Sequence, residues 1–534
     1  MLPPAPWDDR EEDATMSPTM EAELDAPPES GEAPGPRPRR HASTLRSGSA
    51  SLGAVLGTIW FAAACRAPPE PKPSHPDVIL ISLDTLRADR LNTYGYSRHT
   101  TSPDIDALSR DGIVHEAHVA ASPWTTPSHM SLFTSLHPSS HGIIDSFGDV
   151  MAGLQGEAGF ARLADARVTL AEALSAAGYR TAAFTGGLTL SPAIGFDQGF
   201  DSYSSSMFKM SDASLDEMLG WLSQASDRPF FLFWHTFEVH APYLHGELLP
   251  PSLAALRTEL ARHAELAGEL TKADTSNDEM RALLQRHDAY DASVCSNLYD
   301  GGVAAADRWV GRLLHFLRER DLYQDALVVL TSDHGEEFAD HHPDHFYARH
   351  GHSVYEELVR VPLVVKLPGL ARAGLRIEQV TSAVDVMPTI LELAGVGSPP
   401  EGMQGRSLTG LWQAPDGDRE RAALVEGTAF GDELKSIRAG RDKLVVEVPL
   451  ELAGDRGRAW LPPELVRARL FDLVEDPVER RDRLAGTPSA DALATRSALE
   501  ALLRSLVRED PAEVERIELS PETRDALEAL GYVE

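Results

Sequence analysis

The sequence predicts an α/β protein with a large, mostly parallel sheet flanked by helices and a small antiparallel sheet near the C-terminus. Two observations predict this fold class. From Pro76 onward, continuous apolar runs typical of buried parallel strands alternate with helical stretches. Past about residue 420, the segments KSIRAG and RDKLVVEV have the pattern of strands in a small antiparallel sheet.

The first predicted strand is Asp77–Leu83 (DVILISL), an uninterrupted apolar run after its first residue. Ser102 and Pro103 have the N-cap and first-turn chemistry of a short helix. Thr169 and Glu172 form a capping box that starts another helix, which Gly178 ends. Further strands are predicted at Thr181–Thr185, Phe230–Trp234, Ala326–Ser332 and Val361–Leu367.

These elements predict three parts of the chain. Residues 1–75 form an arm and linker, because residues 1–44 are rich in Pro, Glu, Asp and Ser and show no apolar periodicity. Residues 76–415 form the large α/β domain, with a polar helical insertion over 250–295 that we interpret as a hairpin or lid. Residues 416–534 form a small α+β subdomain.

The apolar segment Ser51–Cys65 follows several arginines and is too short to span a membrane as a helix, which needs roughly 20 residues. A basic region, an apolar stretch and small residues at its end are typical of an export signal. The ending Ala62-Ala63-Ala64-Cys65 resembles a bacterial lipobox, with Cys65 as the lipid anchor and Ala in place of the usual Leu. We therefore expect an exported bacterial protein, either periplasmic or a membrane-anchored lipoprotein. The alternative is an apolar helix in a flexible arm.

The net charge of the chain argues against some classes of binding partner. The 534 residues carry 49 Lys and Arg against 82 Asp and Glu, a net charge of −33. So acidic a chain repels nucleic acid, and an anionic substrate has to be attracted locally by a metal or by clustered donors. Only two cysteines occur, Cys65 and Cys295, too few for a disulfide framework.

Polar residues gather where the predicted strands end, and ligands of open α/β sheets bind at such points. Asp84 follows the first strand, and Asp333-His334 follow ALVVLTS. His235 follows FFLFW, with Glu238 and His240 shortly after it. Thr125 lies just before a helix that Pro127 is expected to open over about residues 128–136.

A hydroxyl at that position can attack phosphorus or sulfur if a divalent metal stabilises its deprotonated form. Asp84, Asp333 and His334 supply the oxygen and nitrogen ligands that such a cation needs. Taken singly, each of these residues is as well explained as a helix cap or loop residue, and so is Asp385 before the helix expected at 386–394.

An ordered series of motifs resembles the sulfatase family within the alkaline phosphatase superfamily. The series includes VILISLDTLRADRLNTYGY, TTPSH, FWHTFEVHAPY, TSDHGEEF, HGHSVYEELVRVPLVV, DVMPTILELAGV and LFDLVEDPVE, and it covers about residues 76–485. The resemblance implies an alkaline-phosphatase-like fold, with a mixed central sheet followed by a small domain with a four-stranded antiparallel sheet.

The resemblance also implies roles for individual residues. Asp84, Asp333 and His334 match metal ligands, and Thr125 matches the nucleophile, whose oxygen also binds the metal. His240 and His352 match residues that contact the substrate's oxyanion or leaving group. His129 stands where the sulfatase motif has Arg and is also expected to be catalytic. Glu336 and Glu337, directly after Asp-His-Gly, include one residue expected to orient His334.

The sequence departs from the family at the nucleophile. Sulfatases oxidise a Cys or Ser to formylglycine, whereas Thr125 carries a methyl group on Cβ and cannot give an aldehyde. The Lys and His of the second sulfatase signature are also absent after Gly178-Tyr179. A phosphate ester on a threonine can be released by water, but a sulfate ester is harder to release without the formylglycine route.

We therefore predict a metal-dependent hydrolase or transferase that favours phosphodiester or phosphonate esters. The alternatives are an arylsulfatase-like sulfuric ester hydrolase and an exported binding protein without turnover. One divalent cation (Mn²⁺, Zn²⁺, Mg²⁺ or Ca²⁺) and an anionic small-molecule, glycan or lipid ester are the expected ligands. No motif indicates an oligomeric state. A cluster of histidines forms either a second metal site or a solvated rim: His341, His342, His345, His350 and His352.

Overall fold

The computed structural model describes residues 75–145, 160–205, 209–269, 277–343, 347, 349–397, 400–414, 421–448, 467–507 and 514–517. The strands of the large sheet are β1 (Val78–Leu83), β2 (Ile113–Val119), β4 (Arg180–Phe184), β5 (Ser202–Ser204), β6 (Phe230–Thr236), β7 (Leu327–Thr331), β8 (Leu363–Lys366) and β9 (Arg376–Ser382). The other strands are β3 (Phe160–Arg162), β10 (Ala422–Val425), β11 (Glu433–Ala439), β12 (Asp442–Val448), β13 (Arg467–Asp472) and β14 (Glu515–Ile517).

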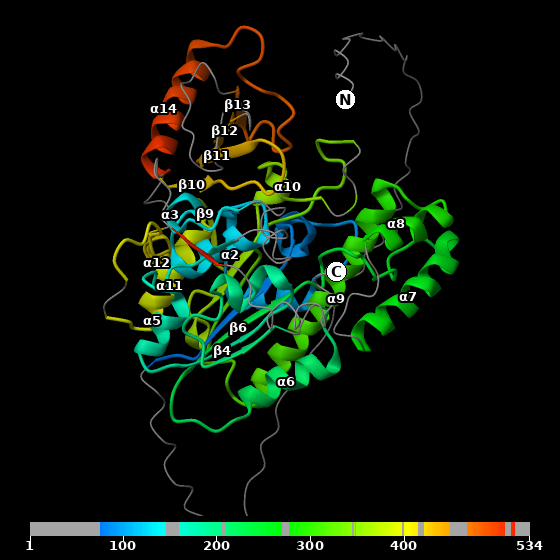
Figure 1. The fold of residues 1–534 in the computed structure, drawn as a ribbon, viewed down its shortest axis with the longest axis vertical. Helices are drawn as coiled ribbons and strands as arrows, with labels where there is room; N and C mark the ends of the chain where they lie inside the picture. Colours follow the sequence, from blue (N-terminus) through cyan, green and yellow to red (C-terminus); the bar gives the residue numbers. More distant parts are fainter. Residues whose placement is uncertain are drawn as a thin grey trace, which may run out of the picture. The chain divides into compact units, whose positions relative to one another are not determined.

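The helices alternate with these strands along the chain (Figure 1). They are α1 (Pro103–Asp111), α2 (Thr125–Thr134), α3 (Pro138–His141), α5 (Leu170–Ala176), α6 (Asp212–Leu222), α7 (Ala254–Glu269), α8 (Asn277–Arg286), α9 (Ala292–Glu319), α10 (Glu356–Val359), α11 (Val386–Leu393), α12 (Thr409–Gln413) and α14 (Ala490–Leu506). The stretch predicted as a helical insertion at 250–295 contains α7 and α8, and its status as an insertion remains a prediction.

The large sheet has eight strands in the order β5-β4-β6-β1-β7-β8-β2-β9. Every strand runs in the same direction except β8, which is antiparallel to both of its neighbours. This confirms the predicted mixed, mostly parallel sheet. Strand β1 lies in the middle, hydrogen-bonded to β6 on one side and β7 on the other. The carboxyl ends of these three strands therefore meet at one edge of the sheet.

Helices cover both faces of the large sheet, and the alternation of side chains along β1 shows how. Ile79 and Ile81 pack into a cluster with residues of α1, α6 and α9. Val78 and Leu80 point to the opposite face, into a cluster with residues of α2, α5 and α11. Successive side chains of a strand alternate between faces, so a strand buried on both sides is apolar throughout.

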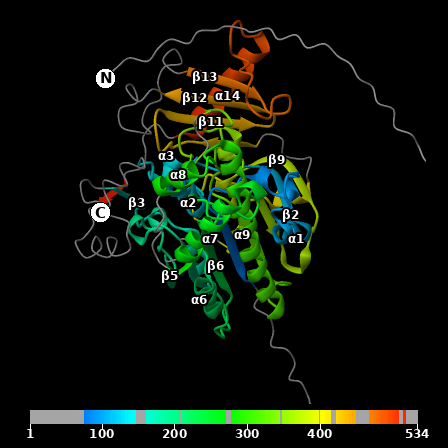
Figure 2. The same cartoon turned by 90° about the vertical axis from the view of Figure 1, so that its right-hand side faces the viewer.

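The second sheet is antiparallel, with the order β10-β11-β12-β13, as predicted for the C-terminal part. One of its faces packs against α14 through residues that include Ile437, Leu444 and Leu499. The other face, with Val425, Val445 and Phe471, packs against the segment around α10. Figure 1 shows α14 along one side of this sheet, and Figure 2 shows the strands of the sheet above the large sheet. The predicted domain boundaries at 75/76 and 415/416 remain predictions.

The predicted capping box of Thr169 and Glu172 on α5 is confirmed. Ser102 occupies the predicted N-cap position of α1, with Pro103 in the first turn, but its hydroxyl makes no capping hydrogen bond. In the large sheet, strands β2, β5 and β9 were not predicted. Strand β2 reads IVHEAHV, and its two buried imidazoles hide the apolar pattern. His118 contacts the hydroxyl of Thr381, and His115 accepts a hydrogen bond from the Trp412 indole. Each imidazole thus has a distant partner for one ring nitrogen, whereas His115 Nδ1 and His118 Nε2 are buried without a hydrogen-bond partner.

The predicted arm over residues 1–75, its apolar segment and Cys65 lie outside the described residues, apart from His75. His345 of the histidine cluster also lies outside them. Among the described helices, none combines the length and the apolar character that a membrane crossing would need.

Candidate active site

Three strand ends bring the predicted polar residues together. Ser82 of β1 is in register with His235 of β6 and with Thr331 of β7. Asp84 follows β1 by one residue, and Asp333 follows β7 by two. Both carboxylates are therefore at the same edge of the sheet, as the parallel arrangement predicts.

Thr125 is the first residue of α2, which begins three residues before the predicted start. Pro127 is tolerated inside the first turn because the amide it lacks would have no helical partner there. The Thr125 hydroxyl lies 3.4 Å from Asp84 Oδ2 and 3.3 Å from His334 Nε2. The residue is almost fully buried. The structure thus brings together all four residues predicted to bind the metal.

The Asp84, Asp333 and His334 side chains form a group that fits a metal ion. Their ligand atoms lie within 4.8 Å of one another, and all three residues are buried. Asp84 Oδ1 and Asp333 Oδ2 have no hydrogen-bond donor. Buried carboxylate oxygens are costly without a partner, so these two atoms are suited to a cation.

Neighbouring groups fix the orientation of these ligands. The Nδ1–H of His334 donates to the carbonyl of Gly335 over 2.9 Å, so that its Nε2 presents a lone pair toward Thr125. The amide of Thr85 donates to Asp333 Oδ1 over 3.3 Å, leaving Oδ2 for the site. His235 Nε2–H donates to Asp84 Oδ2 over 3.1 Å.

The electrostatics reflect this crowding of like charges. Burial, reinforced by the nearby Asp333 and Glu336 carboxylates, raises the pKa of Asp84 well above its usual value. Burial also lowers the pKa of His334 to about 4, although Asp333 acts in the opposite direction. For Asp333, the surrounding imidazoles of His334, His129 and His235 outweigh burial and lower the pKa.

His129 lies beneath the site on the second turn of α2. Its Nδ1–H donates to the Thr125 carbonyl over 3.0 Å and lies 3.4 Å from Asp333 Oδ2. Its Nε2 accepts from the Ser82 hydroxyl at 2.9 Å. Burial lowers its pKa. The side chain therefore holds the start of α2 against β1, and a catalytic role for His129 remains a prediction.

His240 and His350 form a pair at the rim of the site. Their ring centroids are 5.1 Å apart, and the His350 ring is 4.6 Å from that of His334. Burial lowers the pKa of His240 to about 3. Burial also opposes charge on His350, but the Glu336 carboxylate, 2.9 Å from its Nδ1, raises the pKa above its usual value. His350 is therefore the imidazole of this pair that favours a positive charge.

His352 belongs to a different group. Its Nε2 lies 2.6 Å from Glu337 Oε2, and Glu337 also contacts His342. The expectation that one of the two glutamates orients His334 is wrong. Glu336 bonds His350 and Tyr243, Glu337 bonds the two histidines, and His334 is oriented by the Gly335 carbonyl.

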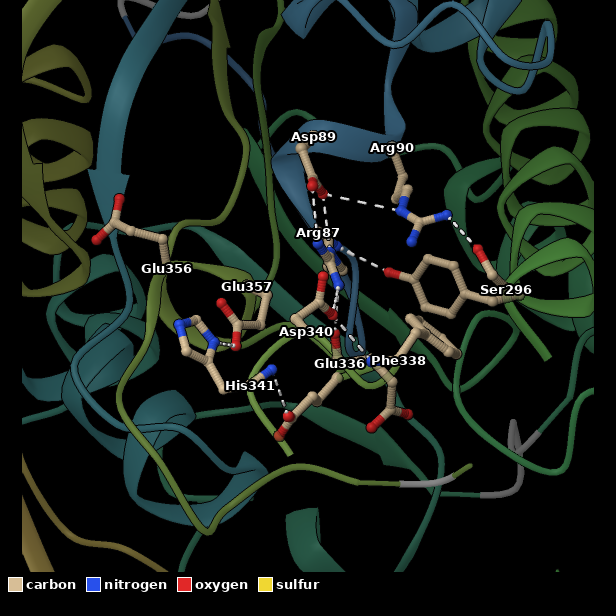
Figure 3. A network of polar contacts seen from close by, with 12 residues as sticks. Arg87, Asp89, Arg90, Ser296, Glu336, Phe338, Asp340, His341, Glu356 and Glu357 are labelled. Carbon is tan, nitrogen blue, oxygen red and sulfur yellow. Dashed lines mark hydrogen bonds and ion pairs between the residues drawn. The ribbon is translucent and has the colours of Figure 1, made fainter. Parts of the chain in front are cut away.

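An arginine network connects the loops after β1 and β7 (Figure 3). The buried Arg87 guanidinium donates to Asp89, to Asp340 over 2.9 Å and to the Glu336 carbonyl over 2.9 Å. His341 bonds Glu357 in the same region over 2.7 Å. Arg87 was not predicted as a site residue. Asp385 directly precedes α11, but the expectation that its side chain caps this helix is wrong, because it makes no capping hydrogen bond there and accepts instead from the amides of Ser382 and Arg406.

Comparisons with known proteins agree with this architecture. A family model described as Sulfatase matches residues 76–396, more than half of the chain. The chain belongs to the sulfatase family. Sulfatases depend on a metal ion, and the Asp84, Asp333 and His334 group is arranged to hold one. Membership of this family indicates an ester hydrolase.

Two curated relatives match shorter segments. The multifunctional alkaline phosphatase superfamily protein PehA of Trinickia caryophylli is 32% identical over 210 residues, which cover 38% of this chain and 39% of PehA. Arylsulfatase K of Mus musculus is 40% identical over 176 residues, which cover 33% of this chain and 30% of that relative. The matched segments thus span well under half of both relatives.

Among solved structures, the phosphonate monoester hydrolase of Agrobacterium radiobacter has a TM-score of 0.57 and 22% identity to this sulfatase-family chain. The alignment covers 81% of this chain and 95% of the hydrolase. The likeness shows a shared fold.

Of the residues at the site, His235 and His350 were noted in the sequence without a specific role, and Arg87 was not singled out. His235 had a usable signal, because it occupies the end of a strand next to β1 in the sheet. The pairing of His350 with Glu336 joins residues 14 positions apart and follows no sequence period.

Proposed function

We propose that this chain is a metal-dependent hydrolase or transferase of phosphate or sulfate esters, with Thr125 as the nucleophile and a preference for phosphodiester or phosphonate esters. The proposal rests chiefly on one observation. The buried Thr125 hydroxyl lies 3.4 Å from Asp84 Oδ2 and 3.3 Å from His334 Nε2, at the first turn of α2.

Asp84, Asp333 and His334 would hold one divalent cation, and the Thr125 oxygen would be its fourth protein ligand. A cation bound there supplies Lewis-acid chemistry, because it lowers the pKa of a nearby hydroxyl and neutralises charge on an ester oxygen. The mixture of carboxylate oxygens and one imidazole suits Mn²⁺ or Zn²⁺, and Mg²⁺ and Ca²⁺ accept the oxygens.

The residues of the chain would then share the remaining tasks. The Thr125 oxygen would attack phosphorus or sulfur and displace the alcohol or aryl oxygen of the ester, while the Thr125 proton passes to Asp84 Oδ2 at 3.4 Å. The free amides at the start of α2 favour an anionic ester. The His350 imidazolium, held by Glu336 beside His240 and His334, offers a positive charge to the ester oxygens or to the leaving group.

The preference for phosphorus follows from the threonine. Its methyl-bearing Cβ excludes an aldehyde, so the sulfatase route through formylglycine is closed. A phosphoryl group on the Thr125 oxygen can be displaced by water in a second step, which regenerates the hydroxyl.

Sulfuric ester hydrolysis is the second candidate. The 40% identity to a segment of arylsulfatase K favours it. An exported binding protein without turnover is the third, and the intact group of Thr125, Asp84, Asp333 and His334 argues against it.

The anionic ester could be a small molecule, a glycan or a lipid, and export with a lipid at Cys65 remains part of the proposal. Intact mass measurement of the membrane fraction would test for that lipid.

An assay panel tests the proposed reaction. The full chain is titrated with Mn²⁺, Zn²⁺, Mg²⁺ and Ca²⁺ against an aryl phosphodiester, an aryl phosphonate monoester and an aryl sulfate. We expect Thr125→Ala to lose at least about 10³-fold in kcat and Thr125→Ser to keep most of it. Thr126→Ala is the matched control, because the Thr126 hydroxyl donates to the Thr189 carbonyl instead of facing Asp84.

Each outcome has a clear reading. Turnover by Thr125→Ala near the wild-type level would remove threonine as the nucleophile. Sulfate cleavage far above phosphodiester and phosphonate cleavage would reverse the substrate preference. A wild-type chain that binds metal but turns over no ester in the panel would favour the binding protein.

A further inference from the structure

Two consecutive glutamates follow the Asp-His-Gly segment and serve opposite sides of the loop. Glu336 bonds His350 and the Tyr243 hydroxyl, toward Thr125 and the candidate metal group. Glu337 bonds His342 and His352, away from that group. The Glu337 amide also donates to the Arg349 carbonyl over 3.0 Å, which aligns the two loop segments.

We propose that Glu337, His342 and His352 form a second divalent-cation site, separate from Asp84, Asp333 and His334. One ligand atom from each residue lies within 4.8 Å of the others. Two imidazoles and one carboxylate are a common ligand set for zinc and related transition metals, and they leave further positions for water or a ligand.

The carboxylate of Glu337 is held in the orientation that such a site needs. Its Oε1 accepts the backbone amides of His341 at 3.1 Å and of His342 at 2.7 Å. Its Oε2 faces His352 Nε2 at 2.6 Å, and His342 Nδ1 lies 3.0 Å from both Oε1 and Oε2. The backbone thus holds Oε1, while Oε2 contacts both imidazoles and accepts from no backbone amide among these contacts. A cation would replace the two N–H protons that now lie between these atoms.

The surroundings differ from those of an ordinary ion pair. A single imidazole is enough to compensate a buried carboxylate, and the neighbouring Glu336 meets one imidazole and a tyrosine hydroxyl. Glu337 meets two imidazoles on one oxygen. Its side chain is fully buried, whereas that of His352 is 14% exposed and that of His342 is 42% exposed. The site is therefore rigid on one side and reachable by ions and water on the other.

The two sites offer different ligands, and zinc fits both. The Thr125 site offers three protein oxygens and one nitrogen, and the Glu337 site offers one carboxylate and two nitrogens. A metal at Glu337 would fix the loop that carries His334 to the loop that carries His350, so that it positions the rim of the active site.

Metal content measured on the full chain tests the proposal. We expect two equivalents of zinc per wild-type chain after equilibration and dialysis, measured by mass spectrometry of the elements. The variant with Asp84→Asn and Asp333→Asn, which weakens the first site, should keep one equivalent. Adding His342→Ala and His352→Ala to that variant should remove it. The readout is stoichiometry, so it does not depend on the reaction proposed for Thr125.

Two further measurements guard against misfolding. His342→Ala alone changes a partly exposed side chain and should weaken zinc binding about 10-fold or more in the Asp84→Asn, Asp333→Asn background. His315→Ala is the matched control, because His315 is an exposed histidine paired with a single glutamate, Glu319, at 3.2 Å. It should leave both zinc equivalents. One zinc equivalent in the wild type, or an equivalent that survives the loss of both His342 and His352, would overturn the proposal.

Discussion

The ion pair between His245 and Glu238 should make the stability of the chain depend on pH. His245 Nε2 lies 2.5 Å from Glu238 Oε1, and the two side chains are 17% and 3% exposed. Burial opposes charge on His245, but the Glu238 and Glu247 carboxylates outweigh it and raise the pKa to about 9. The pair closes the loop that carries His240, so its strength also bears on the site.

The sign of the effect follows from linkage between protonation and folding. The pKa of His245 is about 9 when folded and about 6.5 when unfolded, so folding is stabilised by the bound proton. This stabilisation is fully present below pH 6.5 and is lost as the pH rises through 9. A shift of roughly 2.5 units corresponds to about 3 kcal/mol. Dividing this free energy by an unfolding entropy of about 2.1 cal/mol/K per residue, for roughly 450 residues, gives a change in Tm of about 3 °C.

The test compares the wild type with His245→Gln by calorimetry between pH 6 and pH 10. Glutamine can donate to Glu238 at any pH, so its Tm lacks this dependence. We expect the difference in Tm between the two proteins to shrink by about 3 °C from pH 6.5 to pH 9.5. His287→Gln is the control, since its partner Glu259 lies at the surface with 37% of its side chain exposed. A His245→Gln difference that stays constant with pH would refute the reasoning.

Three other expectations follow from the structure. The buried Lys435 ammonium lies 3.0 Å from Glu426 and 3.1 Å from Glu433. Lys435→Met should therefore lower the free energy of unfolding by about 3–5 kcal/mol, because it leaves two buried carboxylates unpaired. Replacing both glutamates with Gln in the Lys435→Met protein should restore much of the Tm that calorimetry shows to be lost. Gly199 has a φ of +91°, and an added Cβ would lie 2.2 Å from the Glu172 amide nitrogen. Gly199→Ala should therefore lower Tm by several degrees. Gly220→Ala is the control and should leave Tm unchanged, because no atom lies within 4 Å of the added Cβ. Dialysis against a chelator should lower Tm and abolish ester hydrolysis. Adding back a tightly bound cation at about 1,000 times its Kd should raise the free energy of unfolding by roughly 4 kcal/mol. A Tm that the chelator leaves unchanged would argue against a resident metal.

Much of the large sheet could be predicted because its strands are buried on both faces. DVILISL and ALVVLTS became β1 and β7, and their parallel pairing explains why Asp84 and Asp333 meet. Strand β2 was hidden because His115 and His118 interrupt its apolar pattern, and their partners lie hundreds of residues away. The reversed direction of β8 was equally hidden, since an apolar run does not encode its orientation.

In the candidate site, too, residues at the ends of predicted elements could be identified, whereas contacts between distant residues could not. Thr125, Asp84, Asp333 and His334 could be identified because each lies at the end of a recognisable element. The placement of His352 could not, because its neighbour Glu337 is 15 residues away along an irregular loop. Adjacency in the sequence suggested that a glutamate orients His334, whereas the loop turns both glutamates toward histidines beyond it.

The Arg87 guanidinium has a practical consequence for experiments on the metal. It ties the loop after β1 to the Glu336 carbonyl, and the Thr85 amide ties the same loop to Asp333. The spacing of the two carboxylates is thus set by the polypeptide itself. A cation therefore does not have to organise these ligands when it binds, and one folded preparation should accept different cations in turn. The rates measured with a series of metals would then reflect the properties of the ion and not differences in the protein.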